Sequence, residues 1–297
     1  MMKNNIKYGV VDIGSNSVRA ILYSGGKILY KAVITTRLGE GLTFTGRICE
    51  SAFKRTLQTV KNCVVTLISK YADEVLIFAT ETVRSASNGQ DFANAVKENT
   101  GISVDVVAGD EEGEIGLLGA LNGKDGGIID IGGASAEIVA CKGGKIVYSH
   151  SLPLGAVRLF DACGENLQKL DETIENKLDF YGEVPQYVDY HAIGGTATTL
   201  GFIDSVAEKY DEKLVDGREI SIDKIEEILK TLTSMTVDER VEKLRINPKR
   251  AEIIVGGVYM LKKIMERFNI GSVKISESDN LLGYLRKRAF GVSYAKE

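Results

Sequence analysis

Near the middle of the chain the sequence reads GGIIDIGGASAE, from Gly126 to Glu137. An apolar strand ends there around Asp130, a pair of glycines follows, and a second apolar run leads away over residues 138–140. Glycine carries no side chain, so the backbone N–H groups of such a turn can face an incoming anion. The pattern therefore predicts a β-hairpin whose turn holds phosphate.

The same hairpin occurs a second time, nearer the N-terminus. A shift of 118 positions, with no gap, places the DIG of residues 12–14 on the DIG of residues 130–132. The same shift places the GGKI of residues 25–28 on the GGKI of residues 143–146. Chance does not explain a match across a strand, a turn, a second strand and a second turn. We infer that the chain contains two copies of one unit.

The length and the charge of the chain narrow its class. With 297 residues, of which 44% are hydrophobic, it has the size of about two domains and enough apolar side chains for their cores. The repeat predicts a first domain over residues 1–118 and a second over residues 119–297, with the last helix packing back on the first. The net charge of −4 excludes a global positive field that would gather DNA, RNA or an anionic membrane.

The four cysteines point to a reducing compartment. They lie far apart with no Cys-x-x-Cys pair, so neither a disulfide framework nor a zinc site is indicated. The start of the chain, residues 1–5, leads into a strand and does not resemble a signal peptide. No apolar run reaches the roughly 20 residues that span a bilayer. We therefore expect a cytoplasmic protein.

Apolar runs of strand length alternate with stretches of helical periodicity along both copies. This alternation predicts an α/β fold in which helices cover a mixed sheet. A helix over residues 51–71 is expected to begin at an N-cap, Ser51, and a long amphipathic helix over residues 250–268 is a candidate dimer surface. The other predicted strands lie at 8–12, 18–23, 27–35, 75–80, 102–108, 127–131, 136–141, 145–151, 188–193 and 272–275, and the other helices at 91–100, 166–179, 224–233, 237–244 and 280–288.

Two such hairpins, placed face to face by duplication, would bring two carboxylates and two phosphate loops into one interdomain cleft. This arrangement resembles the actin, hexokinase and Hsp70 superfamily, and it implies two ribonuclease H-like (actin-like ATPase) domains. Within the superfamily the chain is similar, over nearly its whole length, to the exopolyphosphatase and guanosine pentaphosphate phosphatase family. The motifs that carry this resemblance are VDIGSNSVR (11–19), ATETVRSASNG (79–89), GDEEG (109–113), the Asp130 hairpin, LPLGAVRL (152–159) and GGTATT (194–199).

The aspartates at the ends of the two matched strands, Asp12 and Asp130, are the predicted metal ligands. Mg²⁺ prefers one or two carboxylates together with phosphate oxygens, and another divalent cation could take the same place. An aspartate that only hydrogen-bonds its own turn is the alternative interpretation of either residue. The duplication of the pair favours a Mg²⁺ site.

Three groups of residues are predicted to bind phosphate. The hairpin turns offer hydroxyl, amide and backbone donors, and GGT at 194–196 follows a buried strand and precedes a helix, where anions bind. Arginine side chains hold phosphate oxygens with two parallel hydrogen bonds, although surface salt bridges are their alternative role. The predicted phosphate ligands are Ser15, Asn16, Arg19, Arg84, Gly132, Gly133, Ser135, Gly194, Gly195 and Thr196, and Arg158 is a further candidate.

Acidic residues after the strand at 102–108 are the candidate general bases. Asp110 could cap the following helix, and acidic residues in a first helical turn are favoured by the helix dipole in any case. The resemblance implies that a glutamate of this motif activates the attacking water, and we align it to Glu112, with Glu111 as its rival. The resemblance also implies a functional carboxylate at Glu137, which we expect to face the cleft because burying an unpaired charge is costly.

The chain departs from the family pattern at three places. The usual Asp-Ile-Gly-Gly-Gly-Ser-Thr-Glu has alanines at 134 and 136, and Glu114 replaces a basic residue. Residues 276–283 read SESDNLLG and lack the Gly-Leu-Arg-Glu of the family. These changes bear on substrate affinity rather than on the fold.

We expect a Mg²⁺-dependent hydrolase that releases the terminal phosphoryl group from inorganic polyphosphate or from guanosine pentaphosphate, by attack of water. The substrate is the expected partner, together with a second copy of the chain in a homodimer. One alternative is an ATP-dependent kinase of the same superfamily that phosphorylates a small molecule. Another is a protein that binds guanosine tetraphosphate or polyphosphate without catalysis. His150 and His191 are expected to be structural.

Overall fold

The computed structural model describes residues 6–296, so the start of the chain, for which the sequence predicts no signal peptide, lies outside the described residues. The chain divides into two compact units, one ending at Glu112 and the other beginning at Gly113. The domain boundary predicted near residue 118 falls inside helix α5 (Gly109–Leu121) and stays a prediction. Within the described residues, no helix has the length and apolar character that a membrane crossing requires.

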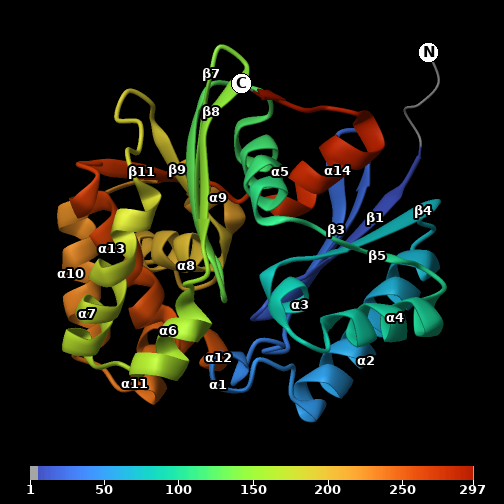
Figure 1. Cartoon of the computed structure of the whole chain (residues 1–297), viewed down its shortest axis with the longest axis horizontal. Coiled ribbons are helices and arrows are strands. Elements are labelled where there is room, and N and C mark those ends of the chain that lie inside the picture. Colours follow the sequence, from blue (N-terminus) through green and yellow to red (C-terminus); the bar gives the residue numbers. More distant parts are fainter. Residues whose placement is uncertain (1–5, 297) are drawn as a thin grey trace. The chain divides into compact units, whose positions relative to one another are not determined.

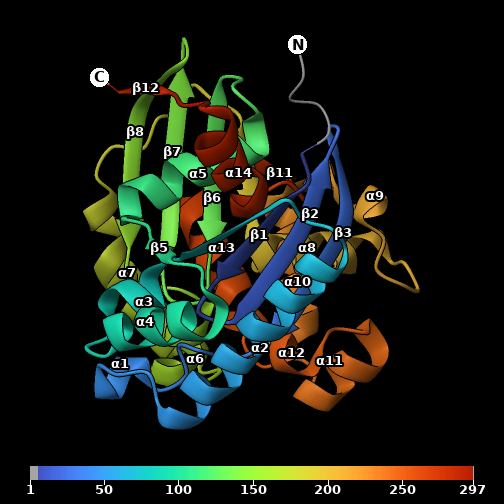
Figure 2. The same ribbon diagram turned by 90° about the vertical axis from the view of Figure 1, so that its right-hand side faces the viewer.

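The first unit is built on a five-stranded mixed sheet with the order β3-β2-β1-β4-β5. Its first three strands, β1, β2 and β3, form an antiparallel meander, which Figure 2 shows. β4 pairs in parallel with β1, and β5 pairs in parallel with β4. Apolar side chains of β1 and β2 pack against those of α2 and α4 to form the core of this unit. The strands are β1 (Tyr8–Ile13), β2 (Ser17–Ser24), β3 (Lys27–Thr35), β4 (Glu74–Ala79) and β5 (Val104–Val106), and the other helices are α1 (Leu42–Thr45), α2 (Glu50–Ser69), α3 (Glu81–Ser85) and α4 (Gly89–Thr100).

The start of α2 differs from the sequence prediction. The helix begins at Glu50 with Cys49 at the N-cap position, so Ser51 lies inside the first turn and is not the cap. Cys49 makes no side-chain cap hydrogen bond. Serine is favoured at an N-cap, yet the first turn begins two residues earlier than that preference indicates.

The second unit repeats this plan with a seven-stranded sheet of order β10-β11-β9-β6-β7-β8-β12. Figure 1 shows α7, α10 and α13 on one side of this sheet and α5 and α14 on the other. The strands are β6 (Gly126–Ile131), β7 (Ala136–Lys142), β8 (Lys145–Leu152), β9 (Tyr190–Ile193), β10 (Glu219–Ser221), β11 (Ser272–Ile275) and β12 (Ala295–Lys296). The helices are α6 (Ala156–Cys163), α7 (Leu167–Leu178), the 3₁₀ helix η1 (Asp179–Tyr181), α8 (Gly194–Ser205), α9 (Glu212–Val215), α10 (Ile222–Thr233), α11 (Val237–Leu244), α12 (Pro248–Ala251), α13 (Ile254–Arg267) and α14 (Asn280–Phe290).

The two sheets match in their hydrogen bonds as well as in their strand order. The amide of Gly14 donates to Ser17 O at 3.1 Å, and that of Gly132 donates to Ser135 O at 3.0 Å. A β-bulge interrupts the second strand of each meander, between residues 22 and 23 and between residues 140 and 141. Both pairs of features are separated by the 118 positions of the sequence repeat. The predicted fold class, two duplicated α/β domains with mixed sheets, is confirmed.

The long helix predicted over residues 250–268 is two helices. α12 ends at Ala251, and α13 begins at Ile254 after a short turn. Apolar periodicity cannot detect such a break, because two successive helices can bury the same face. Most of α13 is buried in the core of its own unit, against β6, β9 and β11. Its apolar face is therefore used within the unit, and the predicted homodimer stays a prediction.

Helices α5 and α14 touch backbone to backbone. A Cβ atom on Gly283 of α14 would clash with the carbonyl oxygen of Ile115, and one on Gly119 of α5 with that of Asp279. Arg286 Nη1 donates to Leu118 O at 2.5 Å and Gly119 O at 2.7 Å, at the carbonyl end of α5. Glycine is unfavourable within a helix, so these glycines are explained by the close approach of the helices.

Replacing Gly283 with alanine should therefore destabilise the protein, although alanine is the better helix former. We expect Gly283→Ala to lower the free energy of unfolding by about 1–3 kcal/mol through overpacking. Gly256→Ala in α13 is the control, because its Cβ would lie 3.3 Å from Leu159 Cβ and needs only a small adjustment. Urea unfolding of both variants tests this, and an equal effect of the two substitutions would contradict the proposed contact.

Candidate active site

In the first unit the carboxylate of Asp12 is paired with Arg19. The two residues lie directly opposite each other on β1 and β2, and Arg19 Nε donates to Asp12 Oδ2 at 2.8 Å. Opposed residues on antiparallel strands point to the same side of the sheet, which explains how the sequence brings them together. The predicted metal ligand and the predicted phosphate ligand thus form an ion pair in this structure.

The turn after Asp12 is held by the segment that follows β3. Asn16 O accepts hydrogen bonds from the amides of Thr36 and Arg37, and Ser15 O accepts one from Gly39. Asn16 Nδ2 donates to Ser17 Oγ at 3.3 Å, while Asn16 Oδ1 has no hydrogen-bond partner among residues 6–296. The backbone of this predicted phosphate loop is therefore fixed, and the amide oxygen of Asn16 is an acceptor that the described residues leave unused.

Glu112 lies in the first turn of α5, where Arg84 holds it. Arg84 Nη1 lies 3.2 Å from Glu112 Oε2, and Arg84 Nη2 lies 2.6 Å from Glu81 Oε2. Burial lowers the pKa of Arg84, but the carboxylates of Glu112 and Glu81 outweigh this effect and the net pKa is raised. Arg84 is thus an organiser of Glu112. The prediction that Asp110 caps α5 is wrong, because the helix begins at Gly109 and Asp110 lies within it. Glu111, the other predicted base, lies next to Asp110 in the same turn.

In the second unit the residue opposite the matched aspartate is acidic. Asp130 on β6 faces Glu137 on β7, and Glu137 in turn faces Ser151 on β8. Ser151 Oγ donates to Glu137 Oε1 at 2.7 Å, and both carboxylates are buried, Asp130 at 7% and Glu137 at 2% exposure. The repeat places Glu137 on Arg19. The second unit therefore has two acidic side chains opposite each other where the first unit pairs an aspartate with an arginine.

The N-terminus of α8 lies against Asp130. Gly194 has φ +81°, and a Cβ there would lie 2.5 Å from Asp130 Oδ1, so only glycine fits. Gly195 is partly exposed at the first turn, where backbone N–H groups favour anions. Thr196 is fully buried and its hydroxyl donates to Ile131 O at 3.1 Å. The side chain of Thr196 thus ties α8 to β6, which leaves only its backbone for the predicted phosphate contact.

Arg250, which the sequence interpretation missed, also lies at this helix end. A Cβ on Gly195 would clash with the guanidinium of Arg250, which therefore lies directly over the GGT turn. Arg250 is half-buried and belongs to α12, 55 positions further along the chain than Gly195. An arginine beside a helix N-terminus is a strong phosphate-binding arrangement. In the sequence, Arg250 comes shortly after Asn247-Pro248 and precedes an apolar helix, and this position was the one sequence signal that could have pointed to it.

The Gly132-Gly133 turn is anchored to α6. Gly132 O accepts from the amide of Ala156 at 2.9 Å, and Gly133 O accepts from that of Val157 at 2.8 Å. Both glycines are partly exposed, whereas Ser135 is buried behind them. Arg158 Nη1 donates to Pro153 O at 2.9 Å. The carbonyl groups of the turn are thus directed to α6.

Comparison with known proteins identifies the family. The sequence model described as the Ppx/GppA phosphatase family matches residues 18–279. The chain belongs to this family.

The chain is also similar to several named proteins and to proteins of known structure. The chain is 27% identical to exopolyphosphatase 2 of Mycobacterium tuberculosis, covering 94% of this chain and 94% of the relative. It is also 27% identical to the bifunctional 3-dehydroquinate synthase/phosphatase of Fusobacterium nucleatum, over 95% of this chain but only 46% of that longer protein. The crystal structure of the Aquifex aeolicus Ppx/GppA family member superposes with a TM-score of 0.79 at 27% identity, covering 96% of this chain and 98% of that one.

The residues of this Ppx/GppA family member fit a divalent cation at Asp130 and Glu137. Among the described residues there is no cluster of three His, Cys, Asp or Glu side chains that could hold a metal by itself. Mg²⁺ does not require one, because it retains water and takes phosphate oxygens. The opposed buried carboxyl groups of Asp130 and Glu137 are oxygen ligands of the kind that Mg²⁺ takes. A metal role for Asp12 stays a prediction.

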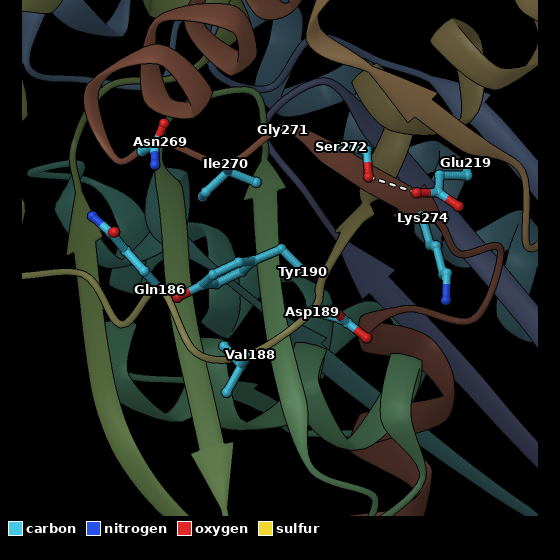
Figure 3. A pocket seen from close by; sticks show the side chains of 10 residues that line it. All are labelled: Gln186, Val188, Asp189, Tyr190, Glu219, Asn269, Ile270, Gly271, Ser272 and Lys274. Carbon is cyan, nitrogen blue, oxygen red and sulfur yellow. Dashed lines mark hydrogen bonds between the residues drawn. The ribbon is translucent and has the colours of Figure 1, made fainter.

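The second unit also has a pocket of about 400 Å³, shown in Figure 3. It lies at the Tyr190 end of β9, opposite the end that leads into Gly194. Its wall includes Asp189, Lys274 and Glu219, which accepts a hydrogen bond from Ser272 Oγ at 2.6 Å. None of the predicted site residues lines it. Neither histidine lies among these catalytic candidates: His150 packs edge-on against Tyr181, and burial, with Lys274 nearby, lowers the pKa of His191.

Proposed function

We propose that this protein hydrolyses the terminal phosphoric anhydride of inorganic polyphosphate or of guanosine pentaphosphate, releasing orthophosphate. One observation carries the proposal. At the carboxyl end of β6, two opposed carboxylates that suit a cation lie beside a helix N-terminus and an arginine that suit a phosphate chain. The membership of a phosphatase family and the likeness to an exopolyphosphatase support the same reaction.

Each group has a part in this chemistry. Asp130 and Glu137 would hold Mg²⁺, or another divalent cation, which when bound neutralises charge on the phosphate oxygens. Arg250 and the backbone N–H groups at Gly194 and Gly195 would hold the phosphate chain, since phosphoryl transfer depends mainly on positioning and on charge stabilisation. Glu112 would orient the attacking water and accept its proton. Arg84 keeps the Glu112 side chain in place.

The decisive experiment offers each substrate to the purified full chain with Mg²⁺ and no acceptor. Orthophosphate should appear from polyphosphate or from guanosine pentaphosphate, and the ratio of the two rates identifies the preferred substrate. Consumption of ATP only when a small-molecule acceptor is present would show a kinase instead. Nucleotide or polyphosphate binding without any turnover would show a non-catalytic binder.

Arg250 provides a prediction that is specific to the second unit. Arg250→Ala should raise KM about 10- to 100-fold, because a charge-assisted hydrogen bond to phosphate contributes about 1.5–3 kcal/mol. Lys243→Ala removes an exposed cation of α11 and is the matched control. Steady-state phosphate release over a range of substrate concentrations measures both. An unchanged KM in Arg250→Ala would show that this arginine does not contact the substrate.

A further inference from the structure

We propose that Asn280 is a positioning residue for the Asp130 carboxylate, and so for the cation that Asp130 binds. Asn280 is the first residue of α14, and its Nδ2 donates to Asp130 Oδ2 at 3.3 Å across 150 positions of sequence. Asp130 Oδ1 lies against the backbone of Gly194 on its other side. The carboxylate is thus held between the first turns of two helices. The inference rests on the proposed function, because it concerns the cation site that this function would use.

The Asn280 amide is buried at a cost to the fold. The residue is 4% exposed, and its Oδ1 has no hydrogen-bond partner within residues 6–296. A buried acceptor without a partner destabilises the native state, so a side chain chosen for packing alone would be apolar. If the amide were turned over, its oxygen would face an oxygen of the Asp130 carboxylate, and two acceptors would meet. The Nδ2 group is therefore assigned as the donor to Asp130.

The surrounding helices are built to accept this amide. Gly116 of α5 leaves room for it, because a Cβ there would lie 2.9 Å from Asn280 Oδ1. The cap of α14 is made by Asp279, whose side chain accepts from the amide of Leu281 at 3.1 Å, so Asn280 is not needed as a cap. Lys287 Nζ reaches buried Glu114 at 2.6 Å and ties the same two helices together. α14 is therefore a rigid support for the donor.

The position of Asn280 in the sequence explains why no pattern pointed to it. It lies within residues 276–283, which read SESDNLLG and carry no motif that the sequence analysis assigned to the site. Groups that orient a metal ligand typically change metal affinity or activity 10- to 100-fold when they are removed.

The test measures Mn²⁺ binding to the full chain, by electron paramagnetic resonance of the free ion, and thermal unfolding without cation. Asn280→Ala and Asn280→Leu remove the donor, and the second keeps a similar volume. We expect both to raise the Mn²⁺ dissociation constant about 10- to 100-fold, and Asn280→Leu, which leaves no cavity, to unfold closer to the wild-type midpoint than Asn280→Ala. Asp130→Asn should remove the same binding, and Asn176→Ala, on the exposed face of α7, should change neither readout.

Three results would overturn the inference: an unchanged Mn²⁺ affinity in both Asn280 variants, a loss of affinity in Asn280→Ala but not in Asn280→Leu, or no Mn²⁺ binding by the wild-type chain. Phosphate release is measured in parallel. A chain whose Mn²⁺ affinity depends on Asn280 but which releases no phosphate keeps this inference and loses the proposed function. A chain that releases phosphate, but whose Mn²⁺ affinity is the same in both Asn280 variants as in the wild type, keeps the proposed function and loses this inference.

Discussion

Glu112→Gln will release phosphate about 10²- to 10⁴-fold more slowly than the wild-type chain, the range expected when a general base is lost. The amide oxygen of glutamine can still accept a hydrogen bond from Arg84 Nη1, which lies 3.2 Å from the carboxylate. It cannot take a proton from water. The first turn of α5 should therefore keep its geometry while the reaction loses its base, and kcat is the parameter that falls.

The neighbouring glutamate supplies the control. Glu111 lies one position earlier in the same helical turn and is less buried. Glu111→Gln changes the charge by the same amount, so its effect measures the general electrostatic cost of the substitution. We expect Glu111→Gln to keep most of its turnover. The opposite ranking of the two variants would make Glu111 the base, and full phosphate release by Glu112→Gln would remove Glu112 from the mechanism. Circular dichroism of both variants shows whether the fold is intact.

The largest effect on stability is expected at Arg240, a fully buried arginine at 0% exposure. Its guanidinium donates to Glu165 Oε2 at 2.9 Å and to the carbonyl oxygens of Leu232, Met235 and Ala251 at 2.8–3.1 Å. One side chain thus satisfies groups from α10, α12 and the turn before α7. Arg240→Met keeps an unbranched apolar stem and removes every donor. Leaving the carbonyl oxygens of Leu232, Met235 and Ala251 without their donor should cost about 3–5 kcal/mol, even though Glu165 itself is about one-third exposed.

An exposed ion pair shows what the charge alone contributes. Arg267 Nη2 bonds Asp179 Oδ1 at 2.5 Å, and both side chains are more than half exposed. Arg267→Met should therefore cost less than about 1 kcal/mol. Urea unfolding followed by circular dichroism compares the two variants. If Arg240→Met were as mild as Arg267→Met, the hydrogen bonds of Arg240 would not be a main support of the second unit.

The sequence was sufficient where a feature depends on neighbours along the chain. Asp12 and Asp130 were predicted at the ends of matched strands, and the strands at 27–35 and 272–275 and the helix at 237–244 were predicted with the bounds that the structure has. The repeat also determines that Arg19 and Glu137 occupy the same place opposite the two aspartates. Strand alternation, glycine turns and helical periodicity are local properties, and a duplication copies all of them together.

Tertiary structure alone decided which distant side chains meet. Arg250 reaches the turn at Gly195, and Asn280 reaches Asp130, because α12 and α14 dock beside the ends of β6 and β9. No periodicity encodes such contacts, since they depend on how whole helices pack. The break between α12 and α13 was invisible for the same reason: both helices bury apolar residues in one core, so the apolar pattern runs on where the backbone turns.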